Sequence, residues 1–137
     1  IDADLESFFD DMPARIAASH LVIGRSGAST VAELSVIGRP SVLVPLPHSL
    51  DNDQKANAGK LQDAGAGIMI EQKNFTAETF ATTLTELLGD VSRLSSMAVA
   101  ALGQGVPDAV GRLADLVEQL GRGEAASGPL HITQEDR

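Results

Sequence analysis

The chain has 137 residues, of which 43% are hydrophobic and 21% charged, a composition typical of one globular domain that leaves little room for a second. It contains no cysteine, which excludes disulfide bonds, thiolate metal sites and a cysteine nucleophile. The formal net charge of −9 argues against binding of a phosphate backbone, so we expect no nucleic-acid partner.

The two ends of the chain suggest a cytoplasmic protein that has been processed or truncated. No apolar run approaches the roughly 18 residues of a membrane-spanning helix, and acidic residues stand where a signal peptide would carry basic ones. The chain begins with Ile1 and not with Met. Residues 122–137 are rich in Gly, Ser and charged residues, so we expect a domain over residues 1–121 followed by a flexible tail.

Three apolar runs predict buried parallel strands, because each is too short for a buried helix and two are ended by Gly or Pro. They are His20–Gly24, Ser41–Pro45 and Gly67–Ile70. A parallel sheet of three strands is thin, so we expect further strands upstream of residue 1.

Helical patterns lie between and after these runs. Apolar or small residues at helical spacing, followed by glycine, predict the first two helices, and capping residues predict the starts of three more. The ranges are Thr30–Ile37, Asp53–Ala64, Thr76–Leu88, Asp90–Leu102 and Pro107–Leu120. Alternation of strands and helices in the first half predicts an α/β sheet.

The loop after the first predicted strand, Arg25–Glu33, is a candidate anion site. Ligands of open α/β sheets bind at the carboxyl ends of the strands, and the free N–H groups and dipole at a helix start favour phosphate. The loop is neither a Walker motif nor a GxGxxG turn. A second interpretation is open, because Thr30 and Glu33 have the spacing of a capping box, in which Glu33 bonds to the first amide of the helix.

The loop after the second predicted strand, Pro45–Gln54, brings a polar cluster to the same edge. It can also be interpreted as an Asx-type turn with a solvated helix start. His48 is predicted to be a loop residue and not a base or ligand. The spacing of His20, His48 and His131 does not fit a zinc site, and we expect no metal.

Five motifs occur together in one order. They are Phe8-Phe-Asp-Asp-Met12, Arg25-Ser-Gly-Ala-Ser-Thr-Val-Ala-Glu33, Gly38-x-Pro40, Val44-Pro-x-Pro-His48 and Asp51-x-x-Gln54-x-x-Asn57-Ala. This set resembles the C-terminal domain of glycosyltransferase family 28, whose peptidoglycan enzymes transfer N-acetylglucosamine from UDP-N-acetylglucosamine to a lipid-linked muramyl-pentapeptide. The resemblance implies a Rossmann-like parallel sheet with helices on both faces, forming most of the C-terminal half of a GT-B glycosyltransferase.

The resemblance implies roles in binding the nucleoside of the donor. The backbone around Phe9 would contact the edge of the uracil, and Met12 is a possible neighbour. Glu33 would accept hydrogen bonds from both ribose hydroxyls, which competes with its capping role.

The resemblance also implies contacts to the diphosphate and the sugar. Ala28, Ser29 and Thr30 would donate hydrogen bonds to both. Gln54 would bind hydroxyls of the N-acetylglucosamine, with Asp53 or Asn52 nearby.

Arg25 is a possible further ligand of the diphosphate. The alternative is an ion pair between Arg25 and Asp10 or Asp11, because these acids are available to balance its charge.

The resemblance implies that the lipid-linked acceptor and the catalytic base belong to an N-terminal domain that this sequence lacks. We therefore name no catalytic residue, expect no cofactor, and expect the isolated chain to be inactive. The whole enzyme would be inverting and peripheral on the cytoplasmic face of the inner membrane. Two alternatives are another UDP-sugar enzyme, such as a 2-epimerase or transferase, and a noncatalytic donor-binding subunit beside a membrane partner.

Overall fold

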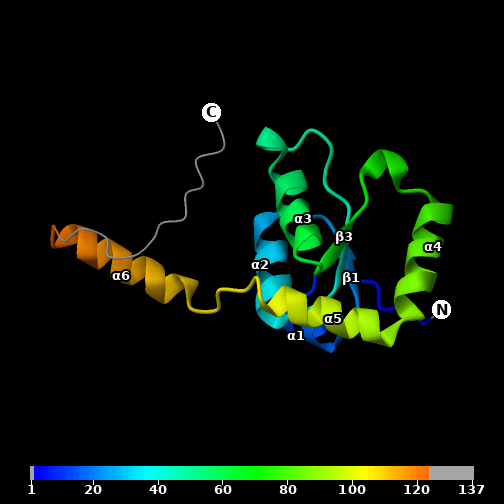
Figure 1. Cartoon of the computed structure of the whole chain (residues 1–137), viewed down its shortest axis with the longest axis horizontal. Coiled ribbons are helices and arrows are strands. Elements are labelled where there is room, and N and C mark those ends of the chain that lie inside the picture. The colour runs from blue at the N-terminus through cyan, green and yellow to red at the C-terminus, as the bar shows by residue number, and fades with distance from the viewer. Residues whose placement is uncertain (1, 124–137) are drawn as a thin grey trace. The chain divides into compact units, whose positions relative to one another are not determined.

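The computed structural model describes residues 2–123, except for the side chain of residue 50 (Figure 1). The chain divides into two compact units, one ending at Val106 and one beginning at Pro107. The second unit contains helix α6 (Ala109–Gly121), on which no residue is buried. Most of the expected tail, from residue 124 on, lies outside the described residues, and the boundary at residue 121 stays a prediction.

The described part of the first unit contains a parallel sheet of three strands in the order β1, β2, β3. The strands are β1 (Val22–Gly24), β2 (Ser41–Leu43) and β3 (Gly67–Met69). All three predicted strands and their parallel direction are therefore confirmed. The outer strands, β1 and β3, each leave one edge without a described neighbour.

Helices and short helical turns precede, connect and follow the strands. They are α1 (Met12–Ala18), α2 (Ala28–Ile37), η1 (Leu50–Asn52), α3 (Asp53–Asp63), η2 (Gln72–Asn74), α4 (Ala77–Leu88) and α5 (Val91–Leu102). Together with α6, the five predicted helices are confirmed to within two residues at their ends. Helix α1 and the two 3-10 turns were not predicted, because they are too short to show a helical period.

The helix ends follow from local residues. Thr76 accepts a hydrogen bond from the Thr79 N–H at 3.1 Å and Asp90 accepts one from the Arg93 N–H at 2.8 Å, so the capping predictions for α4 and α5 are confirmed. Asp108 is the N-cap of α6, but its side chain makes no capping hydrogen bond. Gly38 ends α2 in the left-handed conformation, at φ 75°, which glycine adopts without steric cost.

The core lies on both faces of β2, because successive side chains of a strand point to opposite faces. Leu43 belongs to a cluster with α2 and α3, and its neighbour Val42 belongs to a second cluster with α4 and α5. The fully buried members that come from helices are Leu34, Ala58, Leu61 and Ala101 in the first cluster and Leu87 in the second. Helix α5 contributes to both clusters, through Ala101 and Met97. The expectation of helices on both faces of a parallel sheet is thus confirmed.

Candidate functional site

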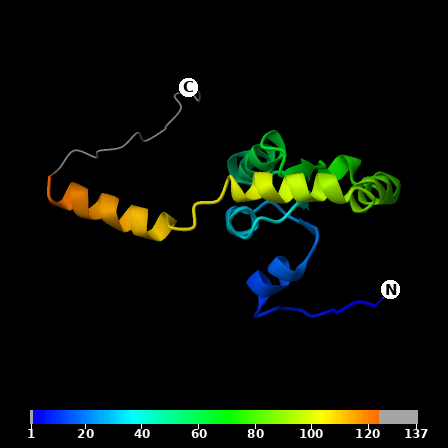
Figure 2. The same cartoon turned by 60° about the horizontal axis from the view of Figure 1, so that its bottom comes forward.

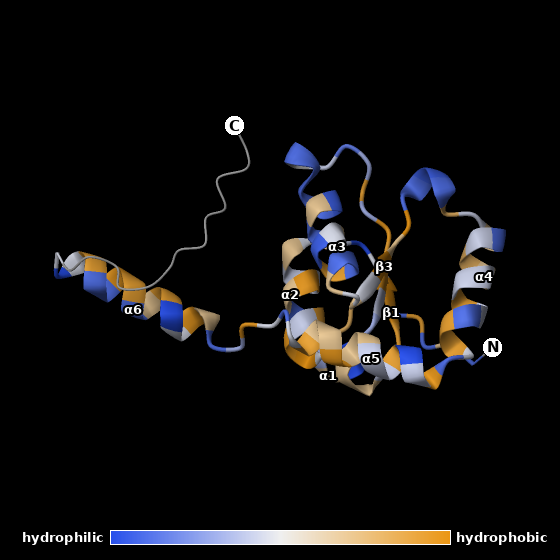
Figure 3. Cartoon of the chain, viewed as in Figure 1, coloured by the Kyte–Doolittle hydropathy of each residue, from blue (hydrophilic) through white to orange (hydrophobic). Residues whose placement is uncertain are grey.

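The loops at the carboxyl ends of the strands form one edge of the first unit. They comprise residues 25–27, 44–52 and 70–76. Since the strands are parallel, these loops meet at the edge where α/β sheets bind ligands. In Figure 3 the turns η1 and η2 at this end are hydrophilic, whereas the strands are hydrophobic.

The start of α2 presents backbone N–H groups without a helical acceptor. Its N-cap is Gly27, which is extended at φ −60° and ψ 154° and supplies no side-chain cap. The first helical hydrogen bond runs from the Val31 N–H to the Gly27 carbonyl at 3.0 Å. The N–H groups of Ala28, Ser29 and Thr30 precede that bond, so they and the helix dipole are available to an anion.

The interpretation of Glu33 as a capping residue is wrong. A capping box needs Ser or Thr at the N-cap, but α2 begins at Ala28, so Thr30 lies inside the first turn. Gly27 turns the chain into the helix earlier than the capping pattern predicts. Among the described residues Glu33 has no hydrogen-bond or ion-pair partner, and it is half-buried. Its carboxylate is available to accept hydrogen bonds from a ligand.

The alternative ion pair of Arg25 with Asp10 or Asp11 is also wrong. The Arg25 guanidinium donates to the carbonyls of Val44, at 3.0 Å, and Pro45, at 3.1 Å. It also donates to the side-chain oxygen of Gln72 at 2.8 Å. Arg25 therefore joins all three loops. Because the Val44 and Pro45 carbonyls accept from its guanidinium, fewer of its N–H groups are available to a diphosphate.

A buried serine joins the first loop to the start of α3. Ser26 is fully buried, and its hydroxyl donates to the Gln54 carbonyl at 2.7 Å. The side-chain amide of Asn57 donates to the Ser26 carbonyl at 3.2 Å. The residues that begin α2 and α3 are thus held at a fixed spacing.

Gln54 shapes the second loop with one side of its amide. Its side-chain oxygen accepts from the Leu46 N–H at 3.0 Å, and its own N–H donates to the Asp53 carboxylate at 2.7 Å. The side-chain nitrogen of Gln54 has no acceptor among the described residues. It can donate to a ligand hydroxyl while the oxygen holds the loop.

The second loop contains unusual backbone conformations. His48, Asp51 and Asn52 have φ values of 58°, 52° and 54°, in the left-handed region that residues other than glycine seldom adopt. Such conformations cluster at binding sites, where the surrounding structure imposes them. The Asx-type interpretation did not predict them.

A cluster of charged residues joins the second and third loops. Glu71 accepts from the Lys55 ammonium at 2.6 Å and from the Lys73 ammonium at 2.8 Å. The hydrogen bonds from Lys55 and then Lys73 lower the pKa of Glu71 to about 2. These residues line a cavity of about 350 Å³ together with His48 and Gln72. Sequence reasoning missed this cluster, because nothing local signals a contact between residues 55 and 71.

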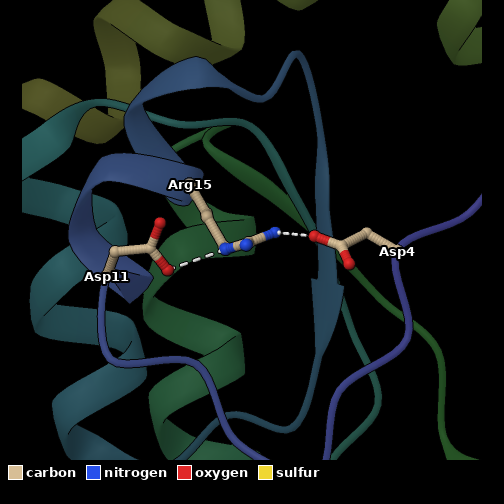
Figure 4. Close-up of polar contacts among 3 residues, drawn as sticks. All are labelled: Asp4, Asp11 and Arg15. Atoms are coloured by element: carbon tan, nitrogen blue, oxygen red, sulfur yellow. Dashed lines mark hydrogen bonds and ion pairs between the residues drawn. The ribbon is translucent and has the colours of Figure 1, made fainter.

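Phe9 and Met12 lie apart from the contacts described above. Phe9 belongs to the segment that leads into α1, and Met12 is the first residue of that helix. The Arg15 guanidinium lies 4.0 Å from the centre of the Phe9 ring. Figure 2 shows α1 and this segment on the outer side of α2. Figure 4 shows α1 and the strand that follows it running in opposite directions, so the start of α1 lies toward the carboxyl end of β1. No described hydrogen bond joins Phe9 to Ala28 or Glu33.

The part of the chain that the structure describes offers no cluster of three His, Asp or Glu side chains suited to a metal ion. Within the same residues, no helix has both the length and the apolar character needed to cross a membrane.

Comparison with known proteins gives a consistent result. A model of the glycosyltransferase family 28 C-terminal domain matches residues 1–113. A UDP-N-acetylglucosamine--N-acetylmuramyl-(pentapeptide) pyrophosphoryl-undecaprenol N-acetylglucosamine transferase of Rhodopseudomonas palustris (strain BisB5) is 57% identical over 122 residues, which are 89% of this chain and 33% of the relative. The transferase of the same name from Methylobacterium nodulans is 61% identical over 110 residues, 80% of this chain and 30% of that protein. The chain thus spans about a third of the length of these relatives.

Solved structures share the fold. The crystal structure of Acinetobacter baumannii MurG aligns with a TM-score of 0.77 and 36% identity, covering 82% of this chain and 32% of that one. The glycosyltransferase VinC, solved in complex with dTDP, aligns with a TM-score of 0.62 over 81% of this chain and 28% of that one. At 18% identity, this second likeness concerns the fold alone.

Proposed function

Because the chain belongs to the glycosyltransferase family 28 C-terminal domain family, we propose that it is the donor-binding part of a peptidoglycan N-acetylglucosaminyltransferase. The whole enzyme would transfer N-acetylglucosamine from UDP-N-acetylglucosamine to the undecaprenyl-diphosphate-linked muramyl-pentapeptide. It would bind the lipid-linked acceptor through the rest of the protein, as a peripheral enzyme on the cytoplasmic face of the inner membrane.

The observation that carries this proposal is the open start of α2 beside an unpaired carboxylate. A nucleotide sugar needs donors for its diphosphate and acceptors for its ribose hydroxyls. Ala28, Ser29 and Thr30 supply backbone donors, and Glu33 lies on the same helix without a described partner. A carboxylate that accepts two hydroxyls makes charge-assisted hydrogen bonds, which are among the stronger ones.

The same geometry supports a role in the reaction. In an inverting transfer, a base outside this chain takes the proton of the acceptor hydroxyl, whose oxygen then forms a bond to the anomeric carbon. The bond from that carbon to the diphosphate breaks, and the electron pair leaves with UDP. The uncapped N–H groups of α2 would stabilise the charge that develops on the diphosphate. Arg25 would contribute mainly by holding the three loops together, since its guanidinium already bonds to Val44, Pro45 and Gln72.

The other site residues complete the proposed donor site. The backbone of Phe9 would contact the edge of the uracil, with Met12 beside it. The amide nitrogen of Gln54, which has no described acceptor, would donate to a hydroxyl of the sugar. Asp53 would act indirectly, because its carboxylate already accepts from the Gln54 N–H.

Substitution of Glu33 by Gln tests the proposal. Hydrogen bonds to charged groups contribute about 1.5–3 kcal/mol, so we expect UDP affinity to fall about tenfold or more. The preference of the chain for UDP over 2′-deoxyuridine diphosphate should shrink as well, because the lost contact is to the ribose. Calorimetric titration measures both affinities, and thermal unfolding should show little change.

Glu86→Gln on α4 is the matched control, since this exposed glutamate has no described partner and lies on another helix. The control should bind UDP like the original chain. Unchanged UDP affinity in Glu33→Gln would refute the assigned role. Equal affinity of the original chain for UDP and dTDP, or no affinity for either, would contradict the proposal that this chain binds the UDP-sugar donor.

A further inference from the structure

We propose that Arg15 is a positioning residue that holds residues 4–11 in the conformation needed to recognise the nucleobase. The inference rests on the proposed function, because it takes Phe9 as the residue whose backbone contacts uracil. It assigns to Arg15 no contact with the nucleotide itself.

One guanidinium makes three contacts along this segment (Figure 4). Its Nε donates to the Asp11 carboxylate and its Nη1 to the Asp4 carboxylate, both at 2.7 Å. Its central carbon lies 4.0 Å from the centre of the Phe9 ring, within the range of a cation–π contact. Arg15 therefore ties both ends of the segment and its central aromatic ring to α1.

Burial does not hold the segment in place. Leu5 is 87% exposed and Phe8 77% exposed, so apolar packing contributes little here. Among the described contacts, the hydrogen bonds and the ring contact of Arg15 are the ones that bridge from the helix to residues 4–11. Exposed ion pairs are individually weak, but three contacts share a single planar group and so restrain one another.

The identity of the side chain matters for this geometry. A guanidinium presents donors in a fixed planar fork and stacks on a ring at the same time, whereas a lysine ammonium is a point charge. Arg15 lowers the pKa of Asp11, chiefly by their hydrogen bond, so the pair favours the ionised carboxylate. The Asp11 and Arg15 pair also has the i, i+4 spacing that stabilises a helix start.

Order in this segment bears on base recognition. Uracil presents a carbonyl acceptor where cytosine presents an amino donor, so backbone groups at fixed positions distinguish the two. If the segment moves freely, binding must first order it, at a free-energy cost that lowers affinity. Loss of Arg15 should thus reduce both UDP affinity and the preference for UDP over CDP.

The test is calorimetric titration of the chain with UDP and with CDP, comparing the original chain with Arg15→Gln and Arg15→Lys. We expect Arg15→Gln to weaken UDP binding about tenfold and to reduce the preference for UDP over CDP about threefold or more. Arg15→Lys, which keeps the charge but not the fork, should fall between. Arg93→Gln on α5 is the matched control, because this exposed arginine has no described side-chain partner, and it should bind like the original chain.

Proton NMR spectroscopy detects the contact between Arg15 and Phe9 in the absence of ligand. The Arg15 δ-protons should be shifted upfield by the Phe9 ring, and the shift should disappear in Phe9→Leu.

If the original chain binds UDP but Arg15→Gln binds it equally well, the inference is wrong and the proposed function stands. If Arg15→Gln loses UDP and CDP affinity equally and its melting temperature falls, Arg15 is a merely structural residue and the inference is again overturned. If neither the original chain nor Arg93→Gln binds UDP, the proposed function fails, and this inference fails with it.

Discussion

Single residues at the carboxyl edge of the sheet have separate tasks. Ser26 and Arg25 connect loops, and Glu33 has no described partner. The amide oxygen of Gln54 accepts from the Leu46 N–H, whereas its amide nitrogen has no described acceptor. Residues that only connect loops should affect stability, whereas those with unused hydrogen-bonding atoms should affect binding. This separation is why Glu33 and not Arg25 is the sharper test of the donor site.

Glu71 is the residue whose protonation should be visible in stability. Its pKa is lowered by Lys55 and Lys73 from 4.5 to about 2, so the folded state binds the proton less tightly than the unfolded state. Its contribution is therefore fully present above about pH 4.5 and is lost as the pH falls toward 2.

We expect Glu71→Gln to lower the melting temperature at neutral pH, and the difference from the original chain to vanish as the pH falls toward 2. Thermal unfolding between neutral pH and pH 2 measures this difference. Glu86→Gln should show no such pH-dependent difference. A constant offset at every pH would mean that Glu71 acts by packing and not by charge.

Two glycines that follow helices have similar φ values but different surroundings. Gly38 after α2 has φ 75° and Gly65 after α3 has φ 74°. A Cβ at Gly38 would lie 2.3 Å from the Leu102 Cγ, whereas nothing lies within 4 Å of a Cβ at Gly65. At Gly38 the end of the helix is also the place where α5 packs.

Gly65→Ala should cost only the left-handed backbone, about 1–2 kcal/mol of unfolding free energy. Gly38→Ala should cost at least about 1 kcal/mol more, because Leu102 must also move. Urea denaturation of both variants measures the difference. Equal losses in the two variants would show that Leu102 moves aside without strain. In a Leu102→Ala background, where the side chain is shorter, we expect the two losses to become equal.

At the scale of the whole molecule, the first unit contains both hydrophobic clusters. Neither cluster includes a residue after Ala101, and α6 has no buried residue. The clusters should therefore hold the first unit together without residues beyond 106.

A chain that ends at Val106 should keep its unfolding free energy within about 0.5 kcal/mol of the original, since none of the described residues that it loses is buried. A chain that ends at Ala100 should unfold, because it loses the fully buried Ala101. Circular dichroism during thermal unfolding distinguishes these outcomes. A large loss in the chain ending at Val106 would show that the second unit supports the first.

The amino-acid sequence by itself determined the three strands, five helices and the stops at Gly38 and Gly65, because apolar period, caps and glycine conformation act over a few neighbouring residues. It also placed Ala28–Thr30 at a helix start, although it set that start too late. The tertiary structure alone decided what Arg25 and Glu33 contact. Arg25 reaches Gln72 over 47 positions, and the start of α2 at Ala28 removed Glu33 from a capping role. Such contacts depend on which loops the folded sheet brings together, and no local pattern encodes that choice.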